Sequence, residues 1–182
     1  MAIRSLAAAL VLIAASAPLS ACVTAPSAEE IRAPAPLRPV DLERFYSGRW
    51  LEIARLPMRI TDGCVAGATN YVVVSPQRVD VRDTCQIDTP QGREKSIGGR
   101  GEVLDPGTNA KLRVRYLGGL VTWDYWVLDH AEDYSWFISA DPTFEKLWIY
   151  TREVPDAAER SALVARAAAL GYDVSRLEFP AF

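Results

Sequence analysis

The residues best suited to covalent chemistry are three cysteines, Cys22, Cys64 and Cys85, and one histidine, His130. A hydrolytic triad needs a nucleophile, a base and an orienting acid, and no such set can be placed around a single histidine expected in a loop. The Cys and His residues do not have the spacing of a metal site, and the sequence has no glycine-rich phosphate loop. The sequence therefore gives little support for catalysis, and we expect neither a metal nor a cofactor.

Cys22 ends a segment that has the pattern of a lipoprotein leader. Arg4 precedes a short apolar run over residues 6–15, which is too short and wrongly flanked for a stable membrane span. The segment closes with Leu19-Ser20-Ala21-Cys22, which matches the bacterial lipobox. We expect residues 1–21 to be a signal peptide and Cys22 to carry palmitate and further acyl chains. The alternative is an ordinary secretory signal with an incidental cysteine.

Several acyl chains on one residue would hold the protein on a bilayer far more strongly than a single chain. By analogy with bacterial lipoproteins, Val23 is not the aspartate that retains them at the inner membrane. We therefore expect attachment to the outer membrane, with the folded domain facing the periplasm. Residues 22–40 contain four prolines and no apolar period, which predicts a flexible tether, and residues 41–182 form the folded domain. The net charge of −3 provides no basic surface for nucleic acid.

The positions of polar and apolar residues alternate with a period of two from Gly48 to Arg152, which predicts strands. The first expected strand begins at Gly48, and the others cover residues 70–74, 79–83, 93–103, 111–116, 123–128, 134–140 and 146–152. Eight strands predict an all-β fold, an eight-stranded antiparallel up-and-down barrel with room for one small ligand. Glycines 98, 99 and 101 suggest bends or bulges in the fourth strand.

A helix should follow the barrel. Asp156 and Glu159 have the spacing of a capping box, and Gly171 marks the end of the helix. Its apolar face predicts packing against the barrel wall, with a membrane-surface role as the alternative. Residues 172–179 are expected to be a short strand or an extended tail.

Three residues are expected to form the floor of the barrel. Gly48 allows the backbone to enter closely, and Trp50 supplies a large apolar surface whose indole N–H needs a partner. Arg152 closes the last strand, where its guanidinium can lie on the Trp50 ring as a cation–π contact.

These residues carry a family resemblance. The run Gly48-Arg49-Trp50-Leu51-Glu52-Ile53-Ala54-Arg55-Leu56-Pro57 resembles the lipocalins, as do Asn70-Tyr71, Tyr125-Trp126-Val127-Leu128, Tyr134, Leu147-Trp148-Ile149-Tyr150-Thr151-Arg152 and Gly171-Tyr172-Asp173-Val174-Ser175. More narrowly, the chain is similar to the bacterial outer-membrane lipocalins, the group closest to apolipoprotein D. The resemblance covers residues 41–182. It implies a barrel that binds a lipophilic molecule.

The expected ligand-binding residues follow from strand parity, since side chains on one strand alternate between the two faces. Tyr71 and Trp148 also match pocket positions in the apolipoprotein D group. The full predicted set is Tyr71, Val73, Val81, Asp83, Leu112, Val114, Tyr116, Tyr125, Val127, Trp148 and Tyr150. Glu52 shares the parity of Trp50. The alternative is that these side chains fill a solid core.

Cys64 and Cys85 lie at similar distances from the turn at residues 75–78, which joins the second and third strands. An oxidising periplasm favours a disulfide between them, and closing a loop of about 20 residues stabilises by about 3 kcal/mol. Because some lipocalins use a free cysteine as a catalytic thiol, two reduced cysteines would support an enzyme instead.

An apolar and aromatic pocket with a few hydroxyls and carboxylates suits an acyl chain whose head group lies at the mouth. We expect a membrane-anchored lipocalin, not an enzyme, that binds, stores or transports fatty acids or lysophospholipids in the cell envelope. Two alternatives stay open: an enzyme acting on a lipophilic substrate, and a structural envelope lipoprotein without a ligand.

Overall fold

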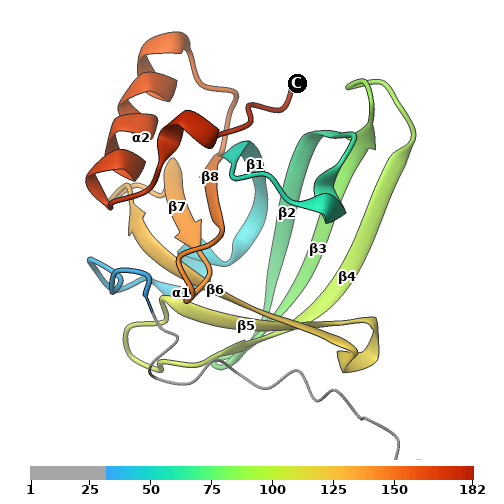
Figure 1. Ribbon diagram of the computed structural model, residues 1–182. Coiled ribbons are helices and arrows are strands. Elements are labelled where there is room, and N and C mark those ends of the chain that lie inside the picture. The colour runs from blue at the N-terminus through green and yellow to red at the C-terminus, as the bar shows by residue number, and fades with distance from the viewer. Residues whose placement is uncertain (1–31) are drawn as a thin grey trace, which may run out of the picture.

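The barrel that the sequence predicts is confirmed in a computed structural model, which describes residues 32–182 (Figure 1). Its strands are β1 (Ser47–Arg55), β2 (Cys64–Ser75), β3 (Arg78–Ile87), β4 (Glu94–Val103), β5 (Lys111–Tyr116), β6 (Val121–His130), β7 (Trp136–Ala140) and β8 (Leu147–Thr151). Each strand pairs antiparallel with the next, and β8 pairs with β1, so the sheet closes on itself. The helices are α1 (Leu42–Phe45) and α2 (Ala157–Ala169), with 3-10 turns η1 (Arg59–Thr61), η2 (Leu117–Gly119) and η3 (Val174–Arg176).

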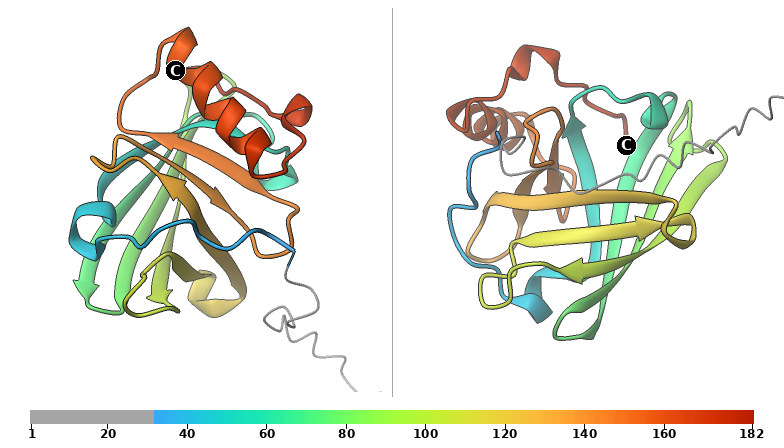
Figure 2. Two further views of the ribbon diagram at one scale, coloured as in Figure 1. Left: turned by 90° about the vertical axis from the view of Figure 1, so that its left-hand side faces the viewer. Right: turned by 60° about the horizontal axis from the view of Figure 1, so that its bottom comes forward.

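The helix α2 lies outside the barrel, as expected (Figures 1 and 2). Asp156 accepts from the backbone N–H of Glu159, whose side chain accepts from that of Asp156, so the predicted capping box is present. Leu163 and Ala167 are buried against residues on the outer faces of β1, β6, β7 and β8. The tail beyond the helix forms η3 and a single bridge between Glu178 and Arg55, not a strand.

Residues 32–40, expected to belong to the flexible tether, lie along the outside of the barrel (Figure 2). The backbone N–H of Leu37 donates to the carbonyl of Leu128 at 2.9 Å, and that of Val40 donates to Thr108 at 2.7 Å. Val40 is buried in the barrel core. The expected signal peptide, Cys22 and the rest of the tether lie outside the described residues.

The glycines of β4 have a different role from the one expected. The pairing of β4 with β3 and β5 runs without a register shift, so these glycines make no bulge. A Cβ on Gly99 would lie 2.5 Å from Val114 Cγ1 and 2.8 Å from Tyr116 Cε1. The absence of a side chain therefore lets the large residues of β5 fill the barrel interior.

The floor of the barrel joins its first and last strands. Trp50 is fully buried, and its Nε1 donates to the carbonyl of Phe45 in α1 at 3.1 Å. The guanidinium carbon of Arg152 lies 3.5 Å from the centroid of the Trp50 ring. Gly48 has a φ of 61°, and a Cβ there would lie 3.7 Å from Nη1 of Arg152, so this turn requires glycine's freedom at positive φ.

Backbone carbonyls hold the Arg152 guanidinium in place. Nη1 donates to the carbonyl of Ser47 at 2.7 Å and to that of Arg49 at 3.0 Å. These bonds connect the end of β8 to the start of β1, while the guanidinium stacks on the indole ring of Trp50. The plug thus combines apolar burial, a cation–π contact and charge-assisted hydrogen bonds.

We predict that Trp50→Ala lowers the free energy of unfolding by about 3–5 kcal/mol, because it opens a cavity in the floor. Arg152→Ala should cost less, and the double variant should show a coupling of at least about 0.5 kcal/mol in a denaturation cycle. As a control, Trp50→Ala combined with Arg166→Ala should be additive, since Arg166 stacks on Trp136 instead. Additive costs for Trp50 and Arg152 would show that their contact contributes nothing.

Candidate functional site

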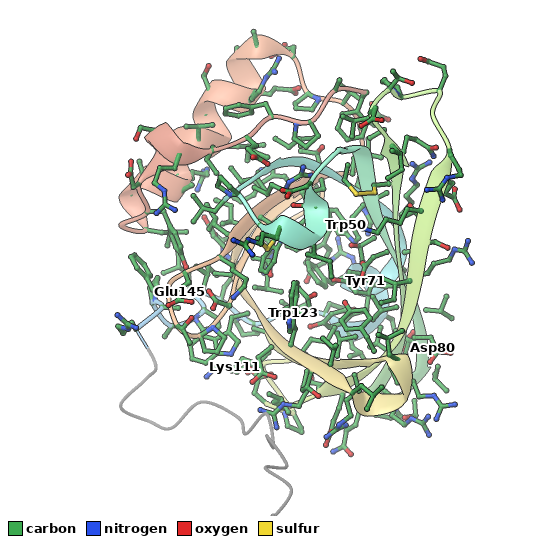
Figure 3. All side chains as sticks on the ribbon, turned by 45° about the vertical axis from the view of Figure 1, so that its right-hand side comes forward. Trp50, Tyr71, Asp80, Lys111, Trp123 and Glu145 are labelled. Carbon is green, nitrogen blue, oxygen red and sulfur yellow. A yellow bond between two sulfur atoms is a disulfide. The ribbon has the colours of Figure 1, made fainter. Side chains whose placement is uncertain are left out.

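A cavity of about 190 Å³ lies inside the barrel toward its open end. Trp123, one of the residues that line it, is labelled in Figure 3. This end is formed by the β1–β2, β3–β4, β5–β6 and β7–β8 connections, opposite the floor at Trp50. η1 lies across the mouth, where Met58, Ile60 and Thr61 contribute to the lining. The disulfide between Cys64 and Cys85, with Cα atoms 5.4 Å apart, also borders the cavity.

The disulfide that the sequence predicts is confirmed, with one correction to its placement. Cys64 is the first residue of β2 and Cys85 lies within β3, so both cysteines are inside paired strands. The expected limits of the second strand were too short because residues 64–69 are mostly small and a register shift between Val65 and Ala68 interrupts the alternation. With both sulfur atoms bonded, neither residue is a free thiol.

Aromatic rings form one wall of the cavity. The ring centroids of Tyr125 and Trp148 lie 5.2 Å apart, and those of Trp123 and Trp148 lie 6.3 Å apart. Tyr150 continues this wall toward the floor, where its ring stacks on Phe137 at 4.6 Å. Such a wall offers a broad apolar surface with hydroxyl groups at its edge.

The cavity brings together five of the eleven predicted ligand-binding residues: Asp83, Tyr116, Tyr125, Trp148 and Tyr150. The structure places the other six among the packed side chains of the barrel interior instead of in the cavity lining: Tyr71, Val73, Val81, Leu112, Val114 and Val127. Strand parity identifies the face of a residue but not its depth, so the two groups could not be separated by sequence.

Asp83 lies at the centre of a hydrogen-bond chain on the cavity wall. Thr69 Oγ1 donates to Asp83 Oδ1 at 2.7 Å, and the Tyr116 hydroxyl donates to Asp83 Oδ2 at 2.7 Å. The Tyr125 hydroxyl lies 3.0 Å from that of Tyr116 and can donate to it in turn. Burial raises the pKa of Asp83, although the bonds from Thr69 and Tyr116 oppose that shift.

Glu52 and Arg55 form a second polar group in the cavity. Arg55 Nη1 donates to Glu52 Oε1 at 2.7 Å, and its other nitrogens reach Glu178 and the carbonyls of Thr61 and Cys64. Burial raises the pKa of Glu52 to about 7, and the charge of Arg55 limits the rise. The guanidinium is thus occupied by protein groups on several sides.

A bulge explains why sequence reasoning missed Arg55. Residues three apart on a regular strand face opposite sides, so parity from Trp50 placed Glu52 inward and Arg55 outward. The register of β1 against β8 shifts between Glu52 and Ala54, which returns Arg55 to the inner face. No pattern in the sequence marks this bulge. Trp123, by contrast, shares the parity of Tyr125 and could have been included, as could Thr69 and Ile97 on their strands.

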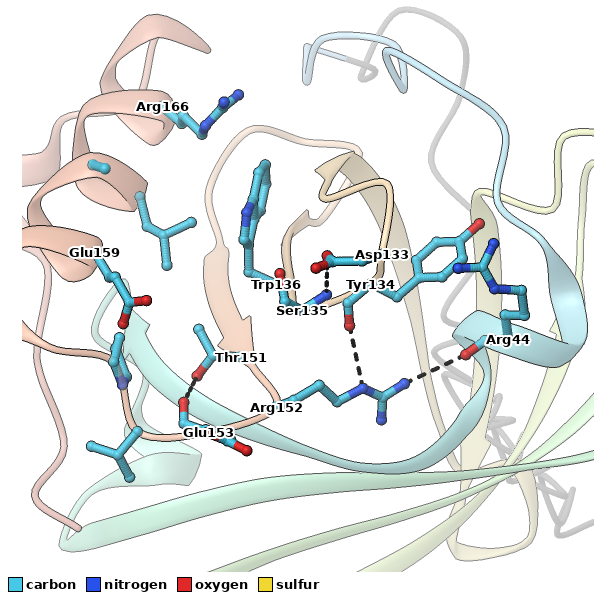
Figure 4. A pocket seen from close by; sticks show the side chains of 14 residues that line it. Arg44, Asp133, Tyr134, Ser135, Trp136, Thr151, Arg152, Glu153, Glu159 and Arg166 are labelled. Carbon is cyan, nitrogen blue, oxygen red and sulfur yellow. Dashed lines mark hydrogen bonds between the residues drawn. The ribbon is translucent and has the colours of Figure 1, made fainter.

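A second hollow of about 820 Å³ lies outside the barrel, between α2 and the closed end (Figure 4). Its cationic side chains already have partners: Arg152 binds backbone carbonyls, and Arg166 donates to Asp129 at 3.1 Å while stacking on Trp136. The groove is therefore a packing feature of the helix and the floor. The cavity inside the barrel, with its apolar wall, is the better candidate for ligand binding.

His130 is the last residue of β6, not a loop residue, and it is buried at the closed end. Its ring nitrogens lie 2.7 Å from the carbonyl of Ala131 and 3.0 Å from that of Pro39, so it holds the segment before α1 against the barrel. Among residues 32–182 there is no cluster of three or more His, Cys, Asp or Glu residues that could hold a metal. No helix in the same range is long and apolar enough to cross a bilayer.

Comparison with known proteins shows which sequences this chain is similar to. Residues 40–181 match the family model of the lipocalin-like domain. The chain is 30% identical over 149 residues to a putative lipocalin of Acanthamoeba polyphaga mimivirus, covering 76% of this chain and 82% of the relative. It is 32% identical over 148 residues to temperature-induced lipocalin-1 of Arabidopsis thaliana, covering 76% of this chain and 77% of the plant protein.

Among solved structures, insecticyanin from Manduca sexta has a similar fold, with a TM-score of 0.61 and 20% identity. The match covers 83% of this chain and 86% of insecticyanin. The two curated relatives are viral and plant proteins, so the narrower bacterial group and the closeness to apolipoprotein D stay predictions.

Glu52 should make stability depend on pH. The pKa of its carboxyl is about 7 in the folded protein and about 4.5 in the unfolded chain. The contribution of Glu52 to stability is therefore fully present below pH 4.5 and is lost as the pH rises through 7. The free energy of unfolding of the native protein should therefore fall between pH 5 and pH 8. We predict that this fall is about 2 kcal/mol smaller in Glu52→Gln.

Chemical denaturation at the two pH values measures this difference. Glu94→Gln, at an exposed carboxylate on β4, is the matched control and should leave the pH dependence unchanged. An identical pH dependence in Glu52→Gln and the native protein would show that the Glu52 pKa is not raised.

Proposed function

The chain belongs to the lipocalin family, whose members bind small hydrophobic molecules, and from that premise we propose that it is a membrane-anchored carrier of fatty acids or lysophospholipids. The observation that carries this proposal is the cavity in the open end of the barrel, which has an aromatic wall, buried polar groups and Lys95 at its mouth. An acyl chain suits the apolar part, and a head group suits the polar part.

An exposed cation at the mouth supports a ligand that enters with its apolar end first. Lys95 is exposed at the mouth, and its Nζ donates to the carbonyl of Ile60 at 3.0 Å. An ammonium group there can pair with the phosphate or carboxylate of a head group that stays near water. Trp148 and Tyr150 lie farther inside, paired across the strands with Arg55 and Glu52, and offer their rings to the acyl chain.

The proposed anchor is the acylated Cys22, which would place the protein on the outer membrane with the barrel in the periplasm. The lipobox sequence supports this placement. Of the alternatives, a thiol enzyme loses its support because Cys64 and Cys85 form a disulfide. The other alternative, a structural lipoprotein that binds no ligand, is tested by the binding experiment below.

We predict that Trp148→Ala weakens the binding of a lysophospholipid by about 5- to 30-fold, since about 1–2 kcal/mol of apolar contact is lost. Isothermal titration calorimetry with delipidated protein measures the change. Trp136→Ala, which removes a ring from the outer groove, should leave binding unchanged. Native protein that binds neither lysophospholipid nor fatty acid would refute the carrier and favour a structural lipoprotein.

We predict that Cys22→Ser releases the protein from membranes and leaves the barrel folded, because the acyl chains are the proposed attachment. Fractionation of cells after a high-salt wash follows the location, and circular dichroism follows the fold. A serine variant that still sediments with the outer membrane would refute the anchor.

A further inference from the structure

The described chain begins beside the open end of the barrel. The backbone N–H groups of Arg32 and Ala33 both donate to the carbonyl of Pro142, at 2.8 and 3.1 Å. Pro142 belongs to the connection between β7 and β8, which lies on the rim of the mouth. The segment then follows the outer wall and reaches α1 at the closed end (Figure 2). Arg32, the first described residue, is therefore bound to the rim of the mouth.

The length of the preceding chain limits how the barrel can face a membrane. From Cys22 to Arg32 is about ten residues, which span at most about 36 Å when fully extended. β7, the strand that leads from the closed end toward Pro142, has 5 residues and is about 17 Å long. If the closed end faced the bilayer, the tether would use about half of its reach to pass back along the wall. The mouth can approach the bilayer without that extension.

The same rim exposes apolar side chains. The β5–β6 connection is Leu117-Gly118-Gly119-Leu120, a turn without charge or polar side chain. Leu120 is 81% exposed and Leu117 is 60% exposed, and Ile60 on η1 is 50% exposed. Leaving such side chains in water costs free energy that insertion among lipids would recover.

We infer that, in the anchored protein proposed above, the open end docks onto the lipid bilayer, with Leu117, Leu120 and Ile60 inserted at its surface. Exposed Arg59 and Asp62 flank the same rim, so apolar insertion and the tether drive docking, not net charge. The cavity then opens directly onto the membrane. A lipid passes between bilayer and barrel without crossing water.

Site-specific fluorescence tests this orientation. A bimane probe is attached at Leu120→Cys or, as the matched control, at Val74→Cys in the acylated full-length protein on phosphatidylcholine vesicles with brominated acyl chains. Val74 is 52% exposed at the opposite end of the barrel, beside the β2–β3 turn. Cys64 and Cys85 are bonded to each other and do not react with the probe. We expect quenching at position 120 to be at least twice that at position 74.

Equal quenching at both positions, or stronger quenching at position 74, would overturn the inference. Protein that does not bind the vesicles would refute the anchor and the docking that rests on it. Docked protein that binds no lipid in calorimetry would refute the carrier function and leave the orientation standing.

A second variant tests the passage of lipid. Leu120 does not line the cavity, so Leu120→Asp should leave the affinity for lysophospholipid in vesicle-free solution unchanged. Its transfer of a fluorescent lysophospholipid from vesicles should slow at least fivefold relative to Val74→Asp. Equal transfer rates in the two variants would overturn direct exchange with the membrane.

Discussion

The contact between Arg152 and Trp50 closes one end of the barrel and thereby determines where a ligand can enter. An eight-stranded barrel has two ends and no sheet edge, so sealing one end leaves a single mouth. The indole fills the floor, α1 accepts its N–H through the carbonyl of Phe45, and the guanidinium covers it from outside. The inside of the barrel changes in character with distance from this closed end. The packed interior comes first, then the aromatic cavity, then the polar and apolar rim.

The size of the cavity follows from how the strands are filled and bent. The absence of a side chain on Gly99 leaves room for Val114 and Tyr116 to pack inside the barrel, where Tyr116 also lines the cavity. The bulge in β1 turns Arg55 inward, where it meets Glu52 and the start of β2. Together these features leave a small space between the packed interior and η1. The ligand site is thus the part of the barrel that its own side chains do not fill.

Much of this could be read from residue types and spacing. The period of two, the Gly48 and Trp50 pair and the capping box at Asp156 predicted the barrel and its helix. The pairing of Cys64 with Cys85 followed from one hairpin. The depth of each inward residue could not be predicted, so Tyr71 and Leu112 were assigned to the ligand although they pack below the cavity. The depth of a residue in the barrel depends on the stagger between strands, and the face toward which its side chain points depends on bulges. Neither leaves a local signal in the sequence.

The path of residues 32–40 shows the same limit. Three prolines and small residues mark this segment as one without regular structure, but the hydrogen bonds of Leu37 and Val40 to the barrel depend on partners far along the chain. Composition describes the local conformation of such a segment and not what it lies against.

The pairing of β1 with β8 has a consequence for how the protein is made. These strands are about 100 residues apart, and Glu178 near the end of the chain must still pair with Arg55. Contacts of this separation form late and slowly, because a long loop must close first. Until the last residues are available, β1 presents an unpaired edge that can associate with other chains. Synthesis of the whole polypeptide must therefore precede barrel closure, and a chain released early would be prone to aggregate.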